Sequence, residues 1–191
     1  MKLDVYFVDA FTDKVFSGNP AAVIFTDIDD ENLMQKIAFE NNLSETAFVN
    51  TNQDTYYIRW FSPIKEVDLC GHATLASAYI YFNYINKDED KVSFMSASGE
   101  LSVRKTDDLY ELDFPKDNLK KIDMTDQVED CIGVKPIETF IGDINLFALL
   151  DNEETLKTLK PNFSKLINLE GQGLIVSSQS NEYDFVSRYF C

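Results

Sequence analysis

The sequence predicts an α+β protein with two lobes, of which the second is incomplete. An almost wholly apolar helix is expected within residues 71–84, and a helix that is apolar on all sides is buried inside a domain. Short strands separated by turns lie on both sides of it, as in a barrel or meander. An Arg-aromatic-Phe pattern occurs in each half of the chain, as RWFS and RYFC, which indicates an internal repeat.

Composition restricts the class of protein. A chain of 191 residues with 45% hydrophobic content can bury a sizeable core. The formal net charge of -16 disfavours binding to nucleic acid or to anionic membranes. No run reaches transmembrane length, and the N-terminal residues lack the features of a signal peptide. We therefore expect a cytoplasmic protein without nucleic-acid or membrane partners.

Residues 1–115 are predicted to form the first lobe. Apolar and alternating runs predict strands, in chain order, at 2–11, 21–25, 44–49, 56–61, 91–95, 100–105 and 109–114. A helix at 31–41 is expected, with Asp29 or Asp30 as its cap and Asn42 at its end. A polar turn joins the strands at 44–49 and 56–61, and the central helix follows the second of them.

Residues 116–191 are predicted to form a partial second lobe that lacks its central helix. The charged stretch at 115–124 is expected to be a linker, and Thr125 is expected to cap a helix at 126–132 that Gly133 ends. The remaining elements are strands at 137–141, 146–150, 173–176 and 184–190 and helices at 152–159 and 164–168. The chain stops where a second loop and central helix would begin.

The loop before the central helix is the strongest candidate site. A helix N-terminus has unpaired N–H groups and the positive end of the helix dipole, so it favours an anion such as a carboxylate. Gly71 allows a ligand to approach the backbone closely. Gly18 and Asn19 either orient a substrate carboxylate or simply form a turn.

Three side chains are candidates for proton chemistry. Glu45 either has its proton affinity raised by apolar neighbours or faces solvent at the start of a strand. His72, the only histidine, is either a structural group or a substrate-binding group. Cys70 is either an acid or base activated by the helix N-terminus or a buried inert thiol. With one histidine and no CxxC pair, a zinc site would need an unusual ligand set, and no metal is expected.

Several runs carry a family resemblance. GNPAAVIF, SETAFV, RWFSPIKEVDLCGHATLA and DFVSRYF resemble, in this order, the phenazine biosynthesis PhzF-like family within the diaminopimelate-epimerase-like fold. The resemblance implies two similar lobes, each a barrel-like, mostly antiparallel sheet around a central helix, with the active site in the cleft between the helix N-termini. It implies an isomerase that needs no metal or organic cofactor, with Glu45 as general acid/base on a small carboxylate-bearing metabolite. It also suggests a homodimer.

The resemblance ends at the last strand. Members of the family continue into a proline, an acidic motif and a turn that opens the second central helix, which this sequence does not contain. Two hypotheses follow. The chain is an isomerase-type enzyme that uses Glu45 for proton transfer and Gly18, Asn19, Gly71 and His72 for substrate binding, or it is a truncated, non-catalytic protein that binds a small acid or a partner.

Overall fold

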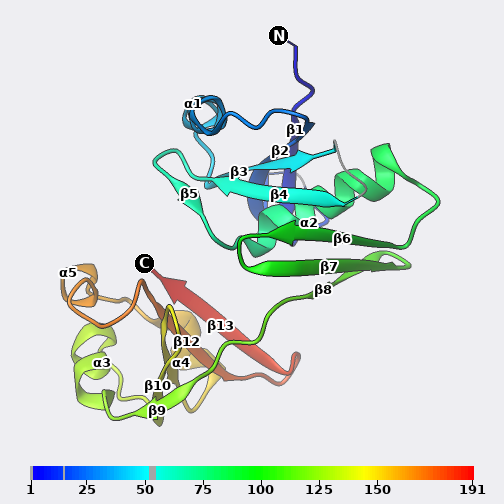
Figure 1. Cartoon of the computed structure of the whole chain (residues 1–191). Coiled ribbons are helices and arrows are strands. Elements are labelled where there is room, and N and C mark those ends of the chain that lie inside the picture. Colours follow the sequence, from blue (N-terminus) through cyan, green and yellow to red (C-terminus); the bar gives the residue numbers. More distant parts are fainter. Residues whose placement is uncertain (1, 15, 52–54) are drawn as a thin grey trace. The chain divides into compact units, whose positions relative to one another are not determined.

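The computed structural model describes residues 2–14, 16–51 and 55–191. The chain divides into two compact units, Met1–Pro115 and Lys116–Cys191 (Figure 1). Part of the polar turn expected between 49 and 56 lies outside the described residues. Among the described helices, none combines the length and the apolar character that crossing a bilayer requires.

The described residues of the first unit form a sheet of eight strands that is mostly antiparallel, as predicted, and that includes a short strand, β5, which the sequence did not predict. The strands are β1 (Tyr6–Ala10), β2 (Asn19–Thr26), β3 (Glu45–Asn50), β4 (Tyr56–Phe61), β5 (Glu66–Val67), β6 (Lys91–Ser96), β7 (Gly99–Thr106) and β8 (Leu109–Asp113). Their order is β1-β2-β3-β4-β6-β7-β8, with β5 paired to β4. Only the β2–β3 and β4–β6 pairs are parallel.

The central helix α2 (Gly71–Ile80) packs against β1, β2 and β3. Its apolar residues share one core with strand residues such as Trp60 and Phe94. The buried hydroxyls of Thr74 and Ser77 donate to carbonyls four residues earlier, at 2.6 and 2.7 Å, so these two hydroxyl groups are satisfied within the helical segment. A buried helix of this composition is therefore compatible with a dry core.

The predicted helix continues beyond α2 as a π-helical turn, η1 (Tyr81–Ile85). Tyr81 and Phe82 remain buried in this turn. The wider turn changes the direction of successive side chains, which a period of 3.6 residues does not predict. The sequence therefore located the helical segment but not its change of type.

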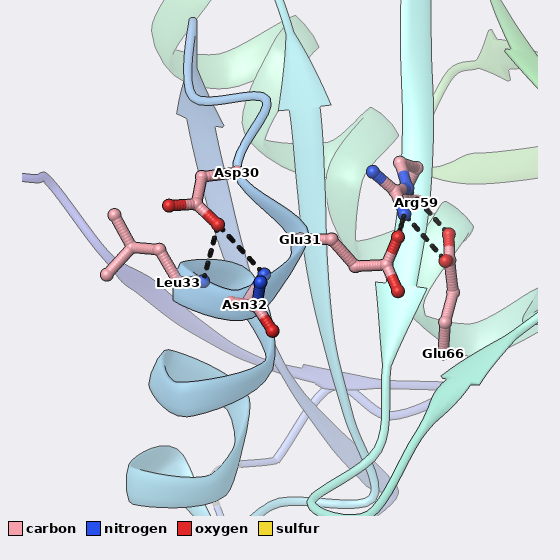
Figure 2. A network of polar contacts seen from close by, with 6 residues as sticks. All are labelled: Asp30, Glu31, Asn32, Leu33, Arg59 and Glu66. Atoms are coloured by element: carbon pink, nitrogen blue, oxygen red, sulfur yellow. Dashed lines mark hydrogen bonds and ion pairs between the residues drawn. The ribbon is translucent and has the colours of Figure 1, made fainter.

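Helix α1 (Glu31–Asn41) begins and ends where the sequence predicts. Asp30 Oδ1 accepts hydrogen bonds from the backbone N–H groups of Asn32 and Leu33, at 3.0 and 3.2 Å (Figure 2). Asn42 ends the helix in the left-handed conformation, with φ of 49°. Of the two expected aspartates, the second is the cap.

Arg59 joins three elements of the first unit. Its guanidinium binds both carboxylate oxygens of Glu66 at 2.6 Å and one oxygen of Glu31 at 3.1 Å (Figure 2). Trp60, the next residue, faces the opposite side of β4 and is buried, as the alternation predicts. Because Glu66 lies in β5, shortly before Cys70, the Arg59 contacts hold the segment that leads into α2.

The second unit is a smaller, five-stranded sheet. The strands are β9 (Lys120–Ile122), β10 (Glu138–Ile141), β11 (Leu146–Leu149), β12 (Leu174–Gln179) and β13 (Phe185–Phe190), and the helices are α3 (Thr125–Ile132), α4 (Glu153–Thr158) and α5 (Phe163–Leu166). The strand order is β13-β12-β11-β10-β9. Only the β11–β12 pair is parallel.

Strands β10 to β13 repeat the arrangement of β1 to β4. In both sets, the successive pairs are antiparallel, parallel and antiparallel. Arg59 lies over the ring of Phe61 at 5.2 Å, and Arg188 lies over the ring of Phe190 at 4.9 Å. Arg188 also donates to the Leu159 carbonyl that follows α4, so each arginine links its strand to the neighbouring helical segment. The similarity of the two lobes is confirmed.

Two predictions for the second unit are wrong. The expected linker at 115–124 contains β9, which pairs with β10. Its charged residues occupy an edge strand, where charge is tolerated and apolar alternation is weak. Thr125 is the first residue of α3 and not its cap, because Met124 holds the cap position. Gly133 ends α3 with φ of 76°, as predicted.

Replacing Arg59 by Met should lower the free energy of unfolding by about 1–3 kcal/mol, because it leaves two carboxylates without their charge-assisted hydrogen bonds. Urea denaturation of the purified chain measures this loss. Arg104→Met on the exposed side of β7 is the matched control and should change stability by less than about 0.5 kcal/mol. Equal effects of the two substitutions would contradict the proposed anchoring role.

Candidate active site

The predicted site residues gather at one end of the first unit. Parallel strands β2 and β3 place Ala21 beside Glu45, so Asn19 and Glu45 lie at the same edge of the sheet. Helix α2 packs against both strands and begins at Gly71. The strand start and the helix start therefore supply side chains to one location.

Glu45, Cys70 and His72 form the centre of this location. His72 Nε2 is 3.4 Å from Glu45 Oε2, and His72 Nδ1 is 3.4 Å from Cys70 Sγ. The side chain of His72 is 10% exposed and that of Glu45 is 21% exposed. Glu45 therefore does not face open solvent at the strand start, and His72 is not isolated in the core.

Strand alternation explains why Glu45 points toward α2. Ala47 and Val49, which share its face of β3, belong to the core around α2, whereas Phe48 on the other face packs near α1. Cys70 precedes α2 in an extended conformation, with φ of -144°. The first turn of α2 therefore begins directly beside the carboxylate, with its backbone at His72 and Ala73 facing the Cys70 thiol.

Burial changes the proton affinity of all three groups. Desolvation raises the pKa of Glu45, while its hydrogen bond with Cys70 opposes the rise. Desolvation lowers the pKa of His72, and an interaction with the Pro20 backbone opposes this lowering. Burial, together with the Glu45 charge, raises the pKa of the Cys70 thiol to about 12. Glu45 and His72 are thus both shifted toward neutral forms, whereas Cys70 keeps its proton.

Gly18 and Asn19 have different surroundings. Gly18 has φ of +73°, and a Cβ there would lie 2.2 Å from the Ala10 carbonyl oxygen, so the β1–β2 turn requires glycine. Asn19, the first residue of β2, is half-buried at the edge that also carries Glu45. The turn explains Gly18 fully, while Asn19 stays available to a ligand at that edge.

The sequence did not identify Phe114 as part of this region. A Cβ on Gly71 would lie 3.4 Å from Phe114 Cε2, so the ring forms a wall beside the helix start. Phe114 was assigned only to the end of a strand. Phe114 and Gly71 are far apart in the sequence, so no local pattern predicts this contact. It depends on where the end of β8 lies relative to the start of α2.

A separate pocket lies on the α1 face of the sheet. Its volume is about 430 Å³, and its lining includes Met34, Phe48, Tyr57, Arg59 and Met95. None of the predicted site residues lines it. We assign the chemistry to the Glu45 cluster because the carboxyl, imidazole and thiol groups whose pKa values burial shifts meet there, and none of the three lines this pocket.

The second repeat has no carboxyl group at the position equivalent to Glu45. Phe61 pairs with Thr46 and Phe190 pairs with Leu174, so the preceding residues, Glu45 and Gly173, occupy equivalent positions. A Cβ on Gly173 would lie 2.5 Å from the Tyr189 ring, which therefore fills that space. Within the described residues, this β-strand position supplies a carboxylate in the first repeat only.

The fold and the site define an α+β protein with a carboxylate and an imidazole at a helix start, and comparisons with known proteins agree. The family model of the phenazine biosynthesis-like proteins matches residues 8–191, and the chain belongs to this family. An uncharacterized isomerase of Pseudomonas aeruginosa is 42% identical over 192 residues, covering 100% of this chain and 73% of the relative. An uncharacterized isomerase of Halalkalibacterium halodurans is 43% identical over 195 residues, covering 100% and 74%.

A solved structure shows the same fold. The phenazine biosynthesis protein of the PhzF family from Enterococcus faecalis superposes with a TM-score of 0.91 and 45% identity, covering 100% of this chain and 74% of that one. The predicted family and fold class are therefore confirmed. The names of the relatives support an isomerase in general terms.

We predict that iodoacetamide at pH 8 modifies Cys191 rapidly and Cys70 slowly in the native protein. Cys191 is exposed, whereas Cys70 is 7% exposed and, with a pKa near 12, only about 1 thiol in 10,000 is ionised at that pH. Peptide mapping by mass spectrometry measures both rates. In denaturant the three cysteines should react alike, and rapid native labelling of Cys70 would contradict the inert environment described here.

Proposed function

We propose that this protein is an isomerase that moves a proton at a carbon atom beside a carboxylate, with Glu45 as general acid/base. The observation that carries the proposal is the position of Glu45, half-buried and 3.4 Å from His72 at the start of α2. The isomerase names of its relatives support the same class of reaction. The substrate is proposed to be a small carboxylate-bearing metabolite.

Glu45 has the properties that proton transfer from carbon requires. A catalytic base works best when its pKa lies near the operating pH, and desolvation shifts Glu45 in that direction. The same carboxyl group, once protonated, returns the proton to another position on the face of the substrate that it contacts. Because the group both takes and returns the proton, the net reaction is an isomerisation; an epimerisation would in addition need a proton donor on the opposite face.

The start of α2 is the proposed binding place for the substrate carboxylate. The positive end of its dipole attracts an anion, and Gly71 leaves room for it on the side away from Phe114. His72 donates a hydrogen bond to the substrate or orients Glu45. Asn19 is a further proposed donor, while Gly18 acts through the turn that positions Asn19.

Cys70 is proposed to position Glu45 and not to exchange protons with the substrate. Its hydrogen bond lowers the pKa of Glu45, whereas its own thiol is held protonated by burial and by the Glu45 charge. A thiol with these properties donates to the carboxylate and fixes its orientation. The chemistry assigned to Glu45 requires no organic cofactor; a homodimer and a cytoplasmic location remain predictions.

The proposal predicts deuterium exchange at carbon. The chain is incubated in D₂O with a panel of small amino, hydroxy and unsaturated carboxylic acids, and proton NMR measures loss of the signal beside the carboxylate. At least one member of the panel should exchange, and Glu45→Gln should slow that exchange by about 100- to 10,000-fold, because it removes the proton carrier.

Glu40→Gln is the matched control, because Glu40 is an exposed glutamate on α1. This variant should exchange its substrate at the rate of the unmodified protein. Circular dichroism should show that both variants fold. An unchanged rate in Glu45→Gln, or the absence of exchange with every acid in the panel, would refute the proposed function.

A further inference from the structure

Glu45, Cys70 and His72 present three kinds of metal-binding atom to one place. Their carboxylate, thiol and imidazole atoms all lie within 4.8 Å of one another. Cys70 is 7% exposed and His72 is 9% exposed, so two of the three groups are already buried. His72 Nε2 is enclosed and lacks a hydrogen-bond partner within the described part of the chain. A buried nitrogen in this state indicates an unfilled interaction.

We propose that this cluster binds one zinc ion, and that the bound ion inhibits proton transfer by occupying the Glu45 carboxylate. Cys70, His72 and Glu45 are the three protein ligands, and water completes the coordination. The binding itself follows from the arrangement of the side chains. Only the inhibitory effect rests on the function proposed above.

The spacing of the ligand atoms suits tetrahedral zinc. Zinc bonds of about 2.0–2.3 Å separate tetrahedral ligand atoms by about 3.3–3.7 Å. His72 Nε2 and Glu45 Oε2 are 3.4 Å apart and already meet this requirement. The three ligand atoms now lie within 4.8 Å of one another, so Cys70 Sγ must approach the other two by at most about 1.5 Å, which a side-chain rotation can provide.

Charge and donor type favour zinc over magnesium or calcium. Coordination replaces the thiol proton by the metal, and the proton passes to solvent: Cys–SH and Zn²⁺ give Cys–S–Zn⁺ and H⁺. One thiolate and one carboxylate then balance both positive charges, which suits a half-buried site. Mixed sulfur and imidazole ligands select zinc and similar thiophilic ions, whereas magnesium and calcium prefer oxygen alone.

A cobalt titration tests the binding directly. Co²⁺ replaces Zn²⁺ in tetrahedral sites, and cobalt–thiolate charge transfer gives an absorption band that reports a sulfur ligand. The full 191-residue chain, kept reduced, should develop this band with one equivalent of CoCl₂, and ZnCl₂ should abolish it. Absence of a saturable band would overturn the proposal.

Variants identify the ligands. Cys70→Ser should eliminate the band, and His72→Gln should weaken zinc binding by about 100-fold or more, because each removes one ligand. Cys131→Ser and Cys191→Ser are the matched controls and should keep both band and affinity. Thermal melting verifies that each variant is folded. A band that persists in Cys70→Ser, or that disappears in Cys191→Ser, would place the metal elsewhere and refute the site.

Measurements of deuterium exchange distinguish the zinc site from the proposed isomerase function, on which only the inhibitory effect of zinc rests. If a carboxylic acid exchanges deuterium, stoichiometric zinc should suppress the exchange and a chelator should restore it. Exchange that continues at full rate with the cobalt band saturated would refute inhibition. If no acid exchanges while the band still forms and depends on Cys70, the proposed function fails and the zinc site stands.

Discussion

The structure of the first unit depends on burying one helix that has almost no polar face. Such a helix is stable only when apolar side chains surround it, and strands with core residues such as Ile58, Trp60 and Phe94 supply them. The hydroxyl groups of Thr74 and Ser77 donate to carbonyls of the same helical segment, so they need no buried water as a partner. The first N–H groups of a helix have no carbonyl partner within it, and in α2 those of His72 and Ala73 lie against the Cys70 thiol.

The candidate site is a consequence of this arrangement. The parallel pair β2–β3 brings Glu45 to the edge where α2 starts, and Cys70 and His72 follow from the connection into the helix. Desolvation disfavours the charged form of both groups, so it raises the pKa of Glu45 and lowers that of His72. A fold that must enclose a helix thus creates a carboxyl group suited to exchange protons.

Much of the secondary structure of the first unit could be predicted because capping residues and strand alternation are local features of the sequence. The α1 boundaries follow from Asp30 and Asn42, and β4 has the predicted bounds because alternation and aromatic content coincide there. The contact of Phe114 with Gly71 and the role of Met124 at the start of α3 could not be predicted, because they depend on packing between distant segments. The sequence supplied Glu45, Cys70 and His72 as separate candidates, and only the register of β3 beside β2 explains their meeting.

The site depends on Glu45 being a half-buried carboxyl group beside His72. Carbon-detected NMR of side-chain carboxyl groups during a pH titration measures this directly, with the Glu45→Gln spectrum assigning the resonance. Glu45 should titrate above the ordinary glutamate value of 4.5, because burial penalises its charged form. Titration at or below that value would mean that Glu45 is solvated or strongly ion-paired, and would contradict the site described here.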